Sequence, residues 1–352
     1  MTPVIAPAGP ETDWRAIHAL LQRAFGYMAG RIDPPSSLHR LSPEDLAQKS
    51  ADQTVLITQA PDPIACLFLE DRGEALYLGK LAVDPAHQGT GAGRALVDAA
   101  ERLAIARGIP RLALQTRVEL SENHAAFARM GFHETGRTRH PGFDRPTSVT
   151  MQKPLPDATG GHAGRLCAIA RRDPVLWRAL DSAAKLDLPD WWIVSGAIYN
   201  SVWNALTGHQ PGYGIKDIDL FYFDASDLSY AAEDRVIRRA LPLFETHPPV
   251  EIRNQARVHL WYEQHFGHPI APHASSRASI AEFASQTHAV GLHLTPGGRV
   301  EICAPYGLDA VFEMRMVPNL RHPNRTTHEA KAARAKGLWP QLEIEHWPAE
   351  RA

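Results

Sequence analysis

The spacing of apolar residues in the first 150 positions predicts helices and strands that follow one another. Apolar residues recur every three or four positions from Trp14 to Phe25, behind a Thr12-Asp13 pair that can cap a helix, so a helix is predicted there. A longer helix is predicted at 91–107, where Leu, Val and Ala fill one face before Gly108 ends it. Short β-rich runs predict strands at 55–58, 64–70, 75–83, 112–116 and 147–152. Mixed strands with helices between them predict a layered α/β (α+β) domain.

The second half of the chain shows a similar alternation of predicted elements. Helices are predicted at 166–171, 174–185, 198–206, 279–286 and 327–338, and strands at 191–194, 217–223, 290–294 and 300–303. Residues 153–164 are rich in Pro, Gly and Ala and predict a linker. We therefore expect two α/β domains, at residues 1–154 and 165–352.

Composition narrows the class of protein only slightly. A net charge of -2 over 352 residues gives no reason to expect a nucleic-acid or membrane partner. No signal-peptide pattern and no apolar run of about 18 residues is present. Cys66, Cys167 and Cys303 stand far apart and suit a reducing compartment, so a cytoplasmic protein is expected.

A glycine-rich loop links the strand predicted at 75–83 to the helix that follows it. The loop consists of Gln88, Gly89, Thr90, Gly91, Ala92, Gly93 and Arg94. Strand, glycine loop and helix together aim backbone N–H groups at a phosphate. The loop lacks the G-x-G-x-x-G spacing of dinucleotide sites, and it ends in Gly93-Arg94-Ala95 rather than in the Gly-Lys-Ser/Thr of a Walker loop.

The pattern Q-x-x-G-x-G from Gln88, together with ENHAAFARMGF at 122–132, resembles the GNAT acetyltransferase superfamily. The resemblance covers residues 1–154 and implies that acetyl-CoA is the cofactor and that a small-molecule amine or a protein amine is the acceptor. It implies that Leu81 and Val83 pair with the pantetheine arm, that the loop amides hold the pyrophosphate, and that Asn123 contacts CoA. Phe127 stands where many members carry the tyrosine that protonates the leaving thiolate.

The residues that would act on the amine are less well marked. Glu74 and Tyr77 are candidates for the general base or for holding a water molecule, because the amine must be neutral to attack. Glu119 is a further candidate for the same role, and a solvated strand end is favoured for it. Tyr27 and Arg31 lie in the irregular segment where the family builds its acceptor pocket, and a proline-fixed surface loop is an equal alternative.

Two aspartates mark the second half. Asp217 and Asp219 stand two apart at the start of a predicted strand, so their carboxylates share one face. The two carboxylates repel one another unless a cation lies between them. We expect this cation to be Mg²⁺, shared with the phosphates of a nucleoside triphosphate. Solvated acids at a strand edge are the alternative. The metal site is favoured, because a buried strand, a small-residue turn and a helix precede the pair.

Strand, small-residue turn, helix and D-x-D strand together resemble the nucleotidyltransferase superfamily. The stretches VEIRNQARVHLWY and APYGLDAVFEMRMVPN resemble one group of bacterial members. The resemblance implies that Glu251 is a third metal-binding carboxylate and that the Ser195-Gly196 turn meets phosphate. Asn254 and Arg257 are candidate nucleotide contacts in the polar run after Glu251, and satisfying buried backbone groups is the alternative role for residues of this run.

The sequence thus predicts an acetyl-CoA-dependent N-acetyltransferase fused to a Mg²⁺-dependent nucleotidyltransferase. The alternative is a single acetyltransferase whose second domain is an inactive module that binds a nucleotide or the acceptor. The helix with Lys331, Arg334 and Lys336 is interpreted as a solvated basic face rather than as a phosphate contact. The sequence indicates no oligomeric state.

Overall fold

The computed structural model describes residues 3–59, 62–244 and 248–348 of the chain. It divides into two compact units, one of residues 1–165 with 205–210 and the other of residues 166–204 with 211–352. None of the described helices has the length and apolar character that a membrane crossing requires.

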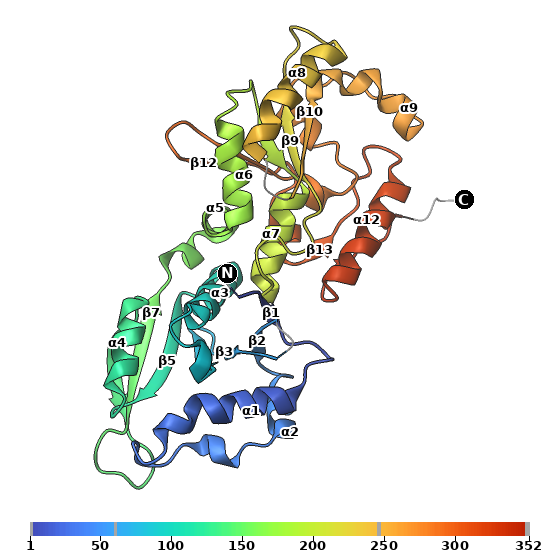
Figure 1. The fold of residues 1–352 in the computed structure, drawn as a ribbon. Coiled ribbons are helices and arrows are strands. Elements are labelled where there is room, and N and C mark those ends of the chain that lie inside the picture. The colour runs from blue at the N-terminus through green and yellow to red at the C-terminus, as the bar shows by residue number, and fades with distance from the viewer. Residues whose placement is uncertain (1–2, 60–61, 245–247, 349–352) are drawn as a thin grey trace. The chain divides into compact units, whose positions relative to one another are not determined.

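The first unit is built on a seven-stranded sheet (Figure 1). In sheet order the strands are β1 (Ile5–Pro7), β2 (Thr54–Thr58), β3 (Ala65–Asp71), β4 (Leu76–Val83), β5 (Arg111–Arg117), β7 (Ser148–Pro154) and β6 (His133–Thr138). The pairing of β4 with β5 is parallel, and every other pair is antiparallel. The single parallel pair therefore lies in the middle of the sheet.

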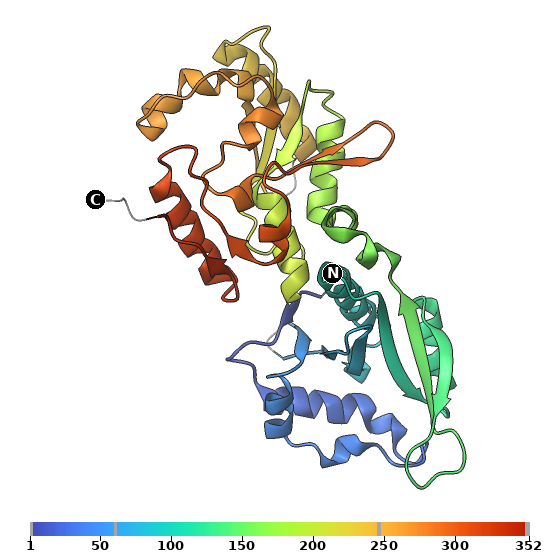
Figure 2. The same cartoon turned by 180° about the vertical axis from the view of Figure 1, so that it is seen from behind.

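Helices cover both faces of this sheet. Helices α1 (Trp14–Phe25) and α2 (Pro43–Lys49) lie on one side and α3 (Ala92–Arg107) on the other, as two opposite views show (Figures 1 and 2). Helix α4 is Ser121–Arg129, and short 3-10 turns occur at Gly26–Met28, Ser37–Arg40 and Pro85–His87. Leu20 and Leu21 of α1 pack with Phe68 of β3 in one buried cluster.

The sequence patterns do not predict two strands of this unit, β1 and β6. Strand β1 has three residues and ends at a proline, so it is too short to show alternation. Strand β6, HETGRT, is exposed throughout and has no apolar face that a pattern could reveal. Both lie at edges of the sheet, where pairing with one neighbour suffices.

The second unit contains a five-stranded sheet. Its order is β10 (Val250–Asn254), β9 (Ile218–Tyr222), β8 (Trp192–Val194), β11 (Gly291–Leu294) and β12 (Val300–Cys303), and a separate parallel pair joins β13 (Arg315–Met316) to β14 (Glu343–Ile344). Strand β9 is parallel to β10 and antiparallel to β8. The start of β9 therefore lies beside the end of β8 and the start of β10.

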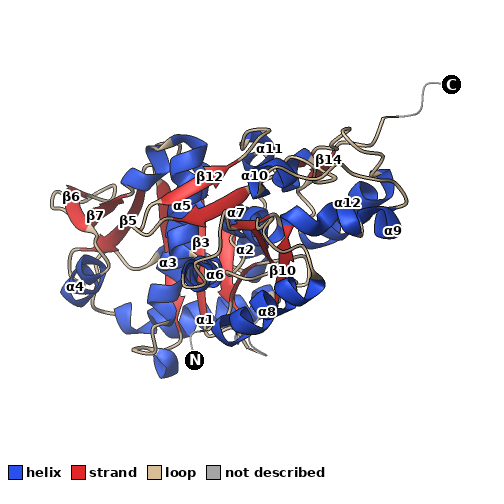
Figure 3. Cartoon of the chain, turned by 90° about the horizontal axis from the view of Figure 1, so that it is seen from above, coloured by secondary structure: helices blue, strands red, loops and turns tan. Residues whose placement is uncertain are grey.

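Helices flank the strands of the second unit (Figure 3). They are α5 (Gly161–Arg172), α6 (Pro174–Ala184), α7 (Gly196–Thr207), α8 (Tyr230–Ala240), α9 (Tyr262–Phe266), α10 (Ser276–Ile280), α11 (Asp309–Phe312) and α12 (Arg325–Leu338). The helix predicted at 279–286 is wrong, because α10 ends at Ile280. The Asn319 side-chain amide donates to the carbonyls of Ala281 and Phe283, both at 2.8 Å, and holds the following segment as a loop.

Candidate functional site

Strands β4 and β5 part halfway along their length. Their parallel pairing ends at Leu78 and Leu114, although β4 continues to Val83. Lys80 lies in the diverging part with a φ of 49°, in the left-handed region that non-glycine residues seldom adopt. The pairing of β3 with β4 is irregular opposite this point. The divergence leaves one edge of β4 unpaired beyond Leu78.

A cavity of about 670 Å³ opens beside this divergence. Leu78, Lys80 and Leu81 line it from β4, Leu114, Gln115, Thr116 and Arg117 from β5, and Asn123 and Phe127 from α4. Two predicted cofactor contacts, Leu81 and Asn123, are thus brought to the same wall. Val83 lies beside the glycine loop instead, since a Cβ on Gly93 would meet its side chain at 3.4 Å.

The glycine loop leads into the exposed N-terminus of α3. Gly89 and Gly91 have φ values of 78° and 91°, which suit glycine and would strain another residue. Helix α3 begins at Ala92 without any side-chain cap, so the first N–H groups of the helix have no side-chain acceptor. Gln88, Thr90 and Arg94 are exposed around this end, and Arg94 pairs with Asp98 at 3.0 Å. The arrangement is suited to an anionic phosphate.

Tyr27 and Arg31 lie next to α4. The Asn123 side-chain amide donates to the Tyr27 hydroxyl at 2.9 Å, and Arg31 forms an ion pair with Glu122. Neither Tyr27 nor Arg31 lines the cavity, but Met28 and Ile32 of the same segment do. The segment predicted to form the acceptor pocket thus contributes apolar groups to this wall, together with the polar side chains of Ser36 and Arg40.

Glu74 and Tyr77 do not reach the cavity. The Glu74 carboxylate is exposed and pairs with Arg111 at 3.0 Å. The ring of Tyr77 lies under the Arg72 guanidinium, 3.6 Å from its carbon to the ring centroid, and burial raises the pKa of the Tyr77 hydroxyl. The geometry gives neither side chain a path to a substrate held between β4 and β5.

In the second unit, the parallel register places Asp219 of β9 beside Glu251 of β10. Asp217 stands just before β9, two positions from Asp219 and on the same face. Burial raises the pKa of the Asp219 carboxyl to about 6, and the negative charges of Asp217 and Glu251 add to the rise. The three carboxylates are therefore electrostatic neighbours.

These carboxylates do not converge on a single point. Glu251 turns toward Arg253, 3.6 Å away, and Asp217 lies 3.9 Å from the Lys216 ammonium group. Within the described ranges, no three His, Cys, Asp or Glu side chains lie close enough to hold a metal ion. The carboxylate oxygens of Asp217 and Asp219 nevertheless suit Mg²⁺, which commonly binds one or two protein carboxylates together with phosphates.

The Ser195-Gly196 turn lies beside these acids, because Val194 of β8 pairs with Asp219. Ser195 is buried and has a φ of 57°, and its N–H donates to the carbonyl of Val290 at 2.9 Å. A non-glycine residue in this region costs roughly 1–3 kcal/mol, and such strain clusters at functional turns. Gly196 begins α7, so the turn and the helix N-terminus adjoin the acidic face.

Asn254 and Arg257 have structural roles. Asn254 is 2% exposed, accepts from the N–H groups of Asp224 and Ala256, and donates to the Asp224 carbonyl at 2.8 Å. Arg257 is buried, forms an ion pair with Glu233, and donates to the Leu228 carbonyl at 2.7 Å. Neither side chain faces the carboxylates with a free polar group, so we leave both out of the nucleotide site.

A second cavity, of about 190 Å³, adjoins the acidic face. Its lining includes Phe221, Arg253, Val258, Tyr262, Phe283 and Lys331. Phe221 follows Asp219 on the same face of β9 and stacks on Phe283, with ring centroids 5.7 Å apart. Lys331 of α12 attracts Asp219 and lowers the pKa of its carboxyl against the effect of burial. The predicted solvated face of this helix thus supplies a cation to the site.

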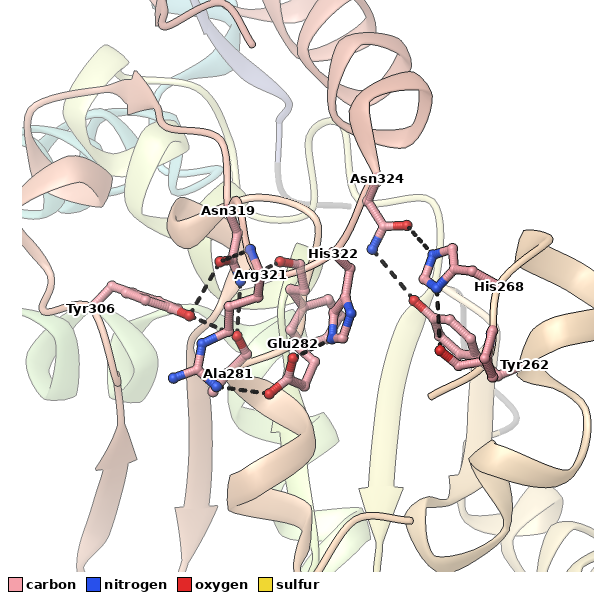
Figure 4. A network of polar contacts seen from close by, with 11 residues as sticks. Tyr262, His268, Ala281, Glu282, Tyr306, Asn319, Arg321, His322 and Asn324 are labelled. Atoms are coloured by element: carbon pink, nitrogen blue, oxygen red, sulfur yellow. Dashed lines mark hydrogen bonds and ion pairs between the residues drawn. The ribbon is translucent and has the colours of Figure 1, made fainter. Parts of the chain in front are cut away.

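Polar contacts hold the wall of this cavity (Figure 4). Glu282 accepts from Arg321 at 2.8 Å and pairs with His322. The Tyr306 hydroxyl donates to the Ala281 carbonyl at 2.8 Å, and the Asn324 amide donates to the Tyr262 hydroxyl at 3.4 Å. No sequence signal marks this network, because its members come from segments up to about 60 residues apart.

Comparison with protein families identifies both units. Residues 14–132 match the acetyltransferase (GNAT) family, and residues 181–344 match a family described as nucleotidyltransferase. The chain therefore combines a GNAT acetyltransferase domain with a nucleotidyltransferase-family domain. Both predicted family memberships are confirmed. A comparison with curated proteins found no significant match.

Several solved structures resemble one unit or the other. An NMR structure described as a CCA-adding enzyme head domain is 23% identical, covering 52% of this chain and 95% of its own, with a TM-score of 0.44. The ribosomal-protein-S18-alanine N-acetyltransferase of Escherichia coli is 24% identical, covering 44% and 94%, with a TM-score of 0.35. PaiA N-acetyltransferase of Thermoplasma acidophilum, solved with coenzyme A, is 18% identical, covering 44% and 99%, with a TM-score of 0.38.

Proposed function

We propose that residues 1–154 transfer an acetyl group from acetyl-CoA to an amine. The observation that carries the proposal is the divergence of β4 and β5 next to the uncapped N-terminus of α3. The pantetheine arm would lie along the unpaired edge of β4 at Leu81 and Val83. The loop from Gln88 to Arg94 would hold the pyrophosphate through backbone N–H groups.

The chemistry requires little more than correct placement. The neutral amine attacks the thioester carbonyl, the carbon–sulfur bond breaks, and the thiolate of CoA leaves, while the nitrogen gives up one proton to the thiolate or to water and becomes the amide. A thiol has an ordinary pKa near 8.5, so the thiolate departs without strong acid catalysis. Holding amine and thioester in contact is worth roughly 7–11 kcal/mol of barrier at best. Phe127 places an apolar ring, rather than a proton donor, in the cavity wall.

Binding and turnover of acetyl-CoA test this proposal. We expect acetyl-CoA to raise the melting temperature of the full chain and to bind in calorimetry. A CoA analogue that lacks the pyrophosphate should have no effect in either measurement. Acetyl transfer is measured as the release of free CoA thiol when each amine of a panel is added. Absence of any acetyl-CoA binding by the folded protein would show the proposal to be wrong.

We further propose that residues 165–352 bind a nucleoside triphosphate with Mg²⁺ and transfer its nucleotidyl group. Asp217 and Asp219 would hold the metal, and Glu251 would join them only after turning from Arg253. The Ser195-Gly196 turn and Lys331 would face phosphate. Bound Mg²⁺ supplies neutralisation of phosphate charge when an acceptor attacks the α-phosphate and pyrophosphate leaves.

A nucleotide-binding module without catalysis is the second candidate for this unit. It is favoured by the ion pair of Glu251 with Arg253 and by the failure of the carboxylates to converge. Calorimetry with each nucleoside triphosphate, with and without Mg²⁺, separates the two when combined with an assay for pyrophosphate. Metal-dependent binding that fails in Asp217→Asn but not in the surface control Asp181→Asn, with pyrophosphate release, supports transfer. Metal-independent binding without pyrophosphate supports the module.

A further inference from the structure

We propose that the amine accepted by the first unit carries an anionic group, a carboxylate or a phosphate, and that Lys49 and Lys80 bind this group. The inference rests on the proposed acetyltransferase function and names the class of its acceptor. Neither the family match nor the likeness to solved structures specifies an acceptor for this chain.

The charged side chains that line the large cavity are all of one sign. Arg40, Lys49, Lys80 and Arg117 line it, together with His140. The described lining contains no Asp or Glu. A cavity with cationic walls and low-dielectric surroundings raises the local concentration of anions and repels cations. Acceptors that carry several ammonium groups are therefore disfavoured, and acceptors with a negative group beside the amine are favoured.

Lys80 is held in the cavity wall by its backbone. Its φ of 49° places it at the irregular point of β4, where the strand leaves β5. The Lys80 ammonium nitrogen lies 5.2 Å from the centroid of the Phe68 ring, which belongs to the buried core. The side chain is half-buried, and left-handed strain at a non-glycine residue is retained chiefly where function requires it.

Lys80 forms no direct ion pair within the described ranges of the chain. Burial lowers the pKa of Lys80, and the positive charge of nearby Lys49 lowers it further. Neither lysine has a carboxylate within 4.0 Å in the part of the chain that the structure describes. Glu70 is close enough to act on both, but both its oxygens are held by Arg72 at 3.0 Å. Asp45 and Glu70 act on these lysines only at longer range, so two neighbouring ammonium groups without a direct ion pair form a place for an anion.

Arg117 is less available than the two lysines. Its guanidinium donates to the Pro34 carbonyl at 2.8 Å and lies 3.3 Å from a ring nitrogen of His140. Glu119 lies 3.8 Å from the same guanidinium and balances part of its charge. Arg117 therefore adds to the positive field of the cavity, and the lysine pair supplies the free donors.

The first test is a panel of matched amines with acetyl-CoA. Each α-amino acid is compared with its amide, and phosphoethanolamine with ethanolamine, while spermidine serves as a polycation. We expect kcat/KM to be at least about tenfold higher for the anionic member of each pair. The amino-acid and phosphoethanolamine arms distinguish a carboxylate from a phosphate. Equal rates within pairs, or preference for the neutral or polycationic members, would overturn the inference.

Variants separate anion binding from proton transfer by Lys80. We expect Lys80→Met and Lys49→Met each to raise KM for the anionic acceptor about tenfold or more, with kcat little changed and the neutral partner unaffected. Lys80→Arg should restore most of the affinity, and Arg15→Met, at an exposed arginine outside the cavity, should change nothing. A fall in kcat for all acceptors, with a shifted pH profile, would make Lys80 a base and overturn the proposal.

Acetyl-CoA binding is measured separately, so that the two proposals fail differently. If acetyl-CoA does not bind, the acetyltransferase proposal is wrong. If acetyl-CoA binds but no amine is acetylated, the CoA-loaded protein is mixed with each amine of the panel. The shift in melting temperature that each amine causes then tests the lysine site. Larger shifts with anionic than with neutral members support the lysine site, and equal or absent shifts overturn it.

Discussion

Leu78 and Leu114 are the last residues that pair between the parallel strands β4 and β5. Beyond this pair, hydrogen-bonding groups of β4 face a cavity instead of a neighbouring strand. The same strand then runs through Val83 into the glycine loop and the N-terminus of α3. The proposed cofactor site is therefore made mostly of backbone, and the residues that matter most in it are those that shape the backbone.

Gly91→Glu should abolish most acetyl-CoA binding. Gly91 caps α3 with a φ of 91°, so any side chain strains the turn, and a carboxylate would also repel the pyrophosphate. We expect the affinity for acetyl-CoA to fall at least about 100-fold, which corresponds to about 2.7 kcal/mol. Calorimetric titration of the purified variant measures this change.

Gly142→Glu is the matched control. Gly142 also has a positive φ, of 86°, and no atom lies within 4 Å of a Cβ built there. The control therefore carries similar backbone strain and the same charge, away from the loop. If both variants bind acetyl-CoA like the parent protein, the glycine loop does not hold the pyrophosphate.

Much of the first unit could be predicted from the sequence, because its main features depend on residues that are close together along the chain. The Asp13 cap, the glycine end of α3 at Gly108 and the loop after β4 each depend on residues a few positions apart. The cavity lining could not be predicted in this way. Lys80 and Lys49 line the same cavity although they are about 30 residues apart, and only the fold brings the two charges together.

In the second unit, too, contacts between residues far apart in the sequence could not be predicted. The two-residue spacing of Asp217 and Asp219 placed them on one face, but the neighbouring Lys331 lies more than 100 residues further on. Helix α12 has no apolar stripe that would reveal which side faces the protein, so the sequence predicts a solvated basic face there. The sequence does not reveal the structural role of Arg257, because its partner Glu233 lies in a different helix.

Asp219→Asn should stabilise the protein while removing metal-dependent nucleotide binding. The Asp219 carboxylate is partly buried beside two other carboxylates, so an uncharged isostere relieves desolvation and repulsion. We expect the free energy of unfolding to rise by about 1 kcal/mol in EDTA, as is common when functional residues are replaced. Chemical denaturation measures the rise, and nucleotide titration with Mg²⁺ measures the loss. A destabilised variant would contradict the proposed repulsion.

Arg257→Met should destabilise the fold rather than weaken nucleotide binding selectively. The substitution leaves Glu233 buried without its partner, and breaking a buried ion pair costs roughly 3–5 kcal/mol. Urea denaturation measures the loss. Asp181→Asn, which breaks an exposed pair with Lys185, should change stability by no more than about 0.5 kcal/mol. A stable Arg257→Met protein with weakened nucleotide affinity would return Arg257 to the binding site.

The second unit should lose stability in mild acid through His288. This side chain is fully buried, stacks on Tyr199 with ring centroids 4.7 Å apart, and has no hydrogen-bond partner at either nitrogen within the described structure. Burial lowers the pKa of His288 well below its ordinary value, so below about pH 6.5 the unfolded chain takes up a proton that the folded chain does not. Stability is therefore retained above this pH and falls below it.

His288→Phe should reduce this acid sensitivity. One such histidine contributes up to about 1.4 kcal/mol per pH unit below its unfolded pKa. We expect the difference in the free energy of unfolding between pH 7 and pH 5.5 to shrink in His288→Phe and to persist in His265→Phe, an exposed position. Urea unfolding at both pH values measures the two slopes. Parallel slopes for His288→Phe and the parent would show that His288 is protonated in the folded protein.

Phe127→Tyr should raise the rate of acetyl transfer. Phe127 lines the cavity at the position where many GNAT proteins carry a tyrosine, and its ring packs edge-on against Phe132 with centroids 5.9 Å apart. An added phenol supplies a proton donor for the departing thiolate. Because the thiolate already leaves readily, we expect kcat to rise by only about 3- to 10-fold, with KM for acetyl-CoA unchanged. The gain should disappear toward pH 10, where the phenol loses its proton.

Phe25→Tyr, which adds a hydroxyl elsewhere on the same cavity wall, is the control and should leave kcat unchanged. Equal kcat values for both folded variants and the parent would show that thiolate protonation does not limit the proposed acetyl transfer.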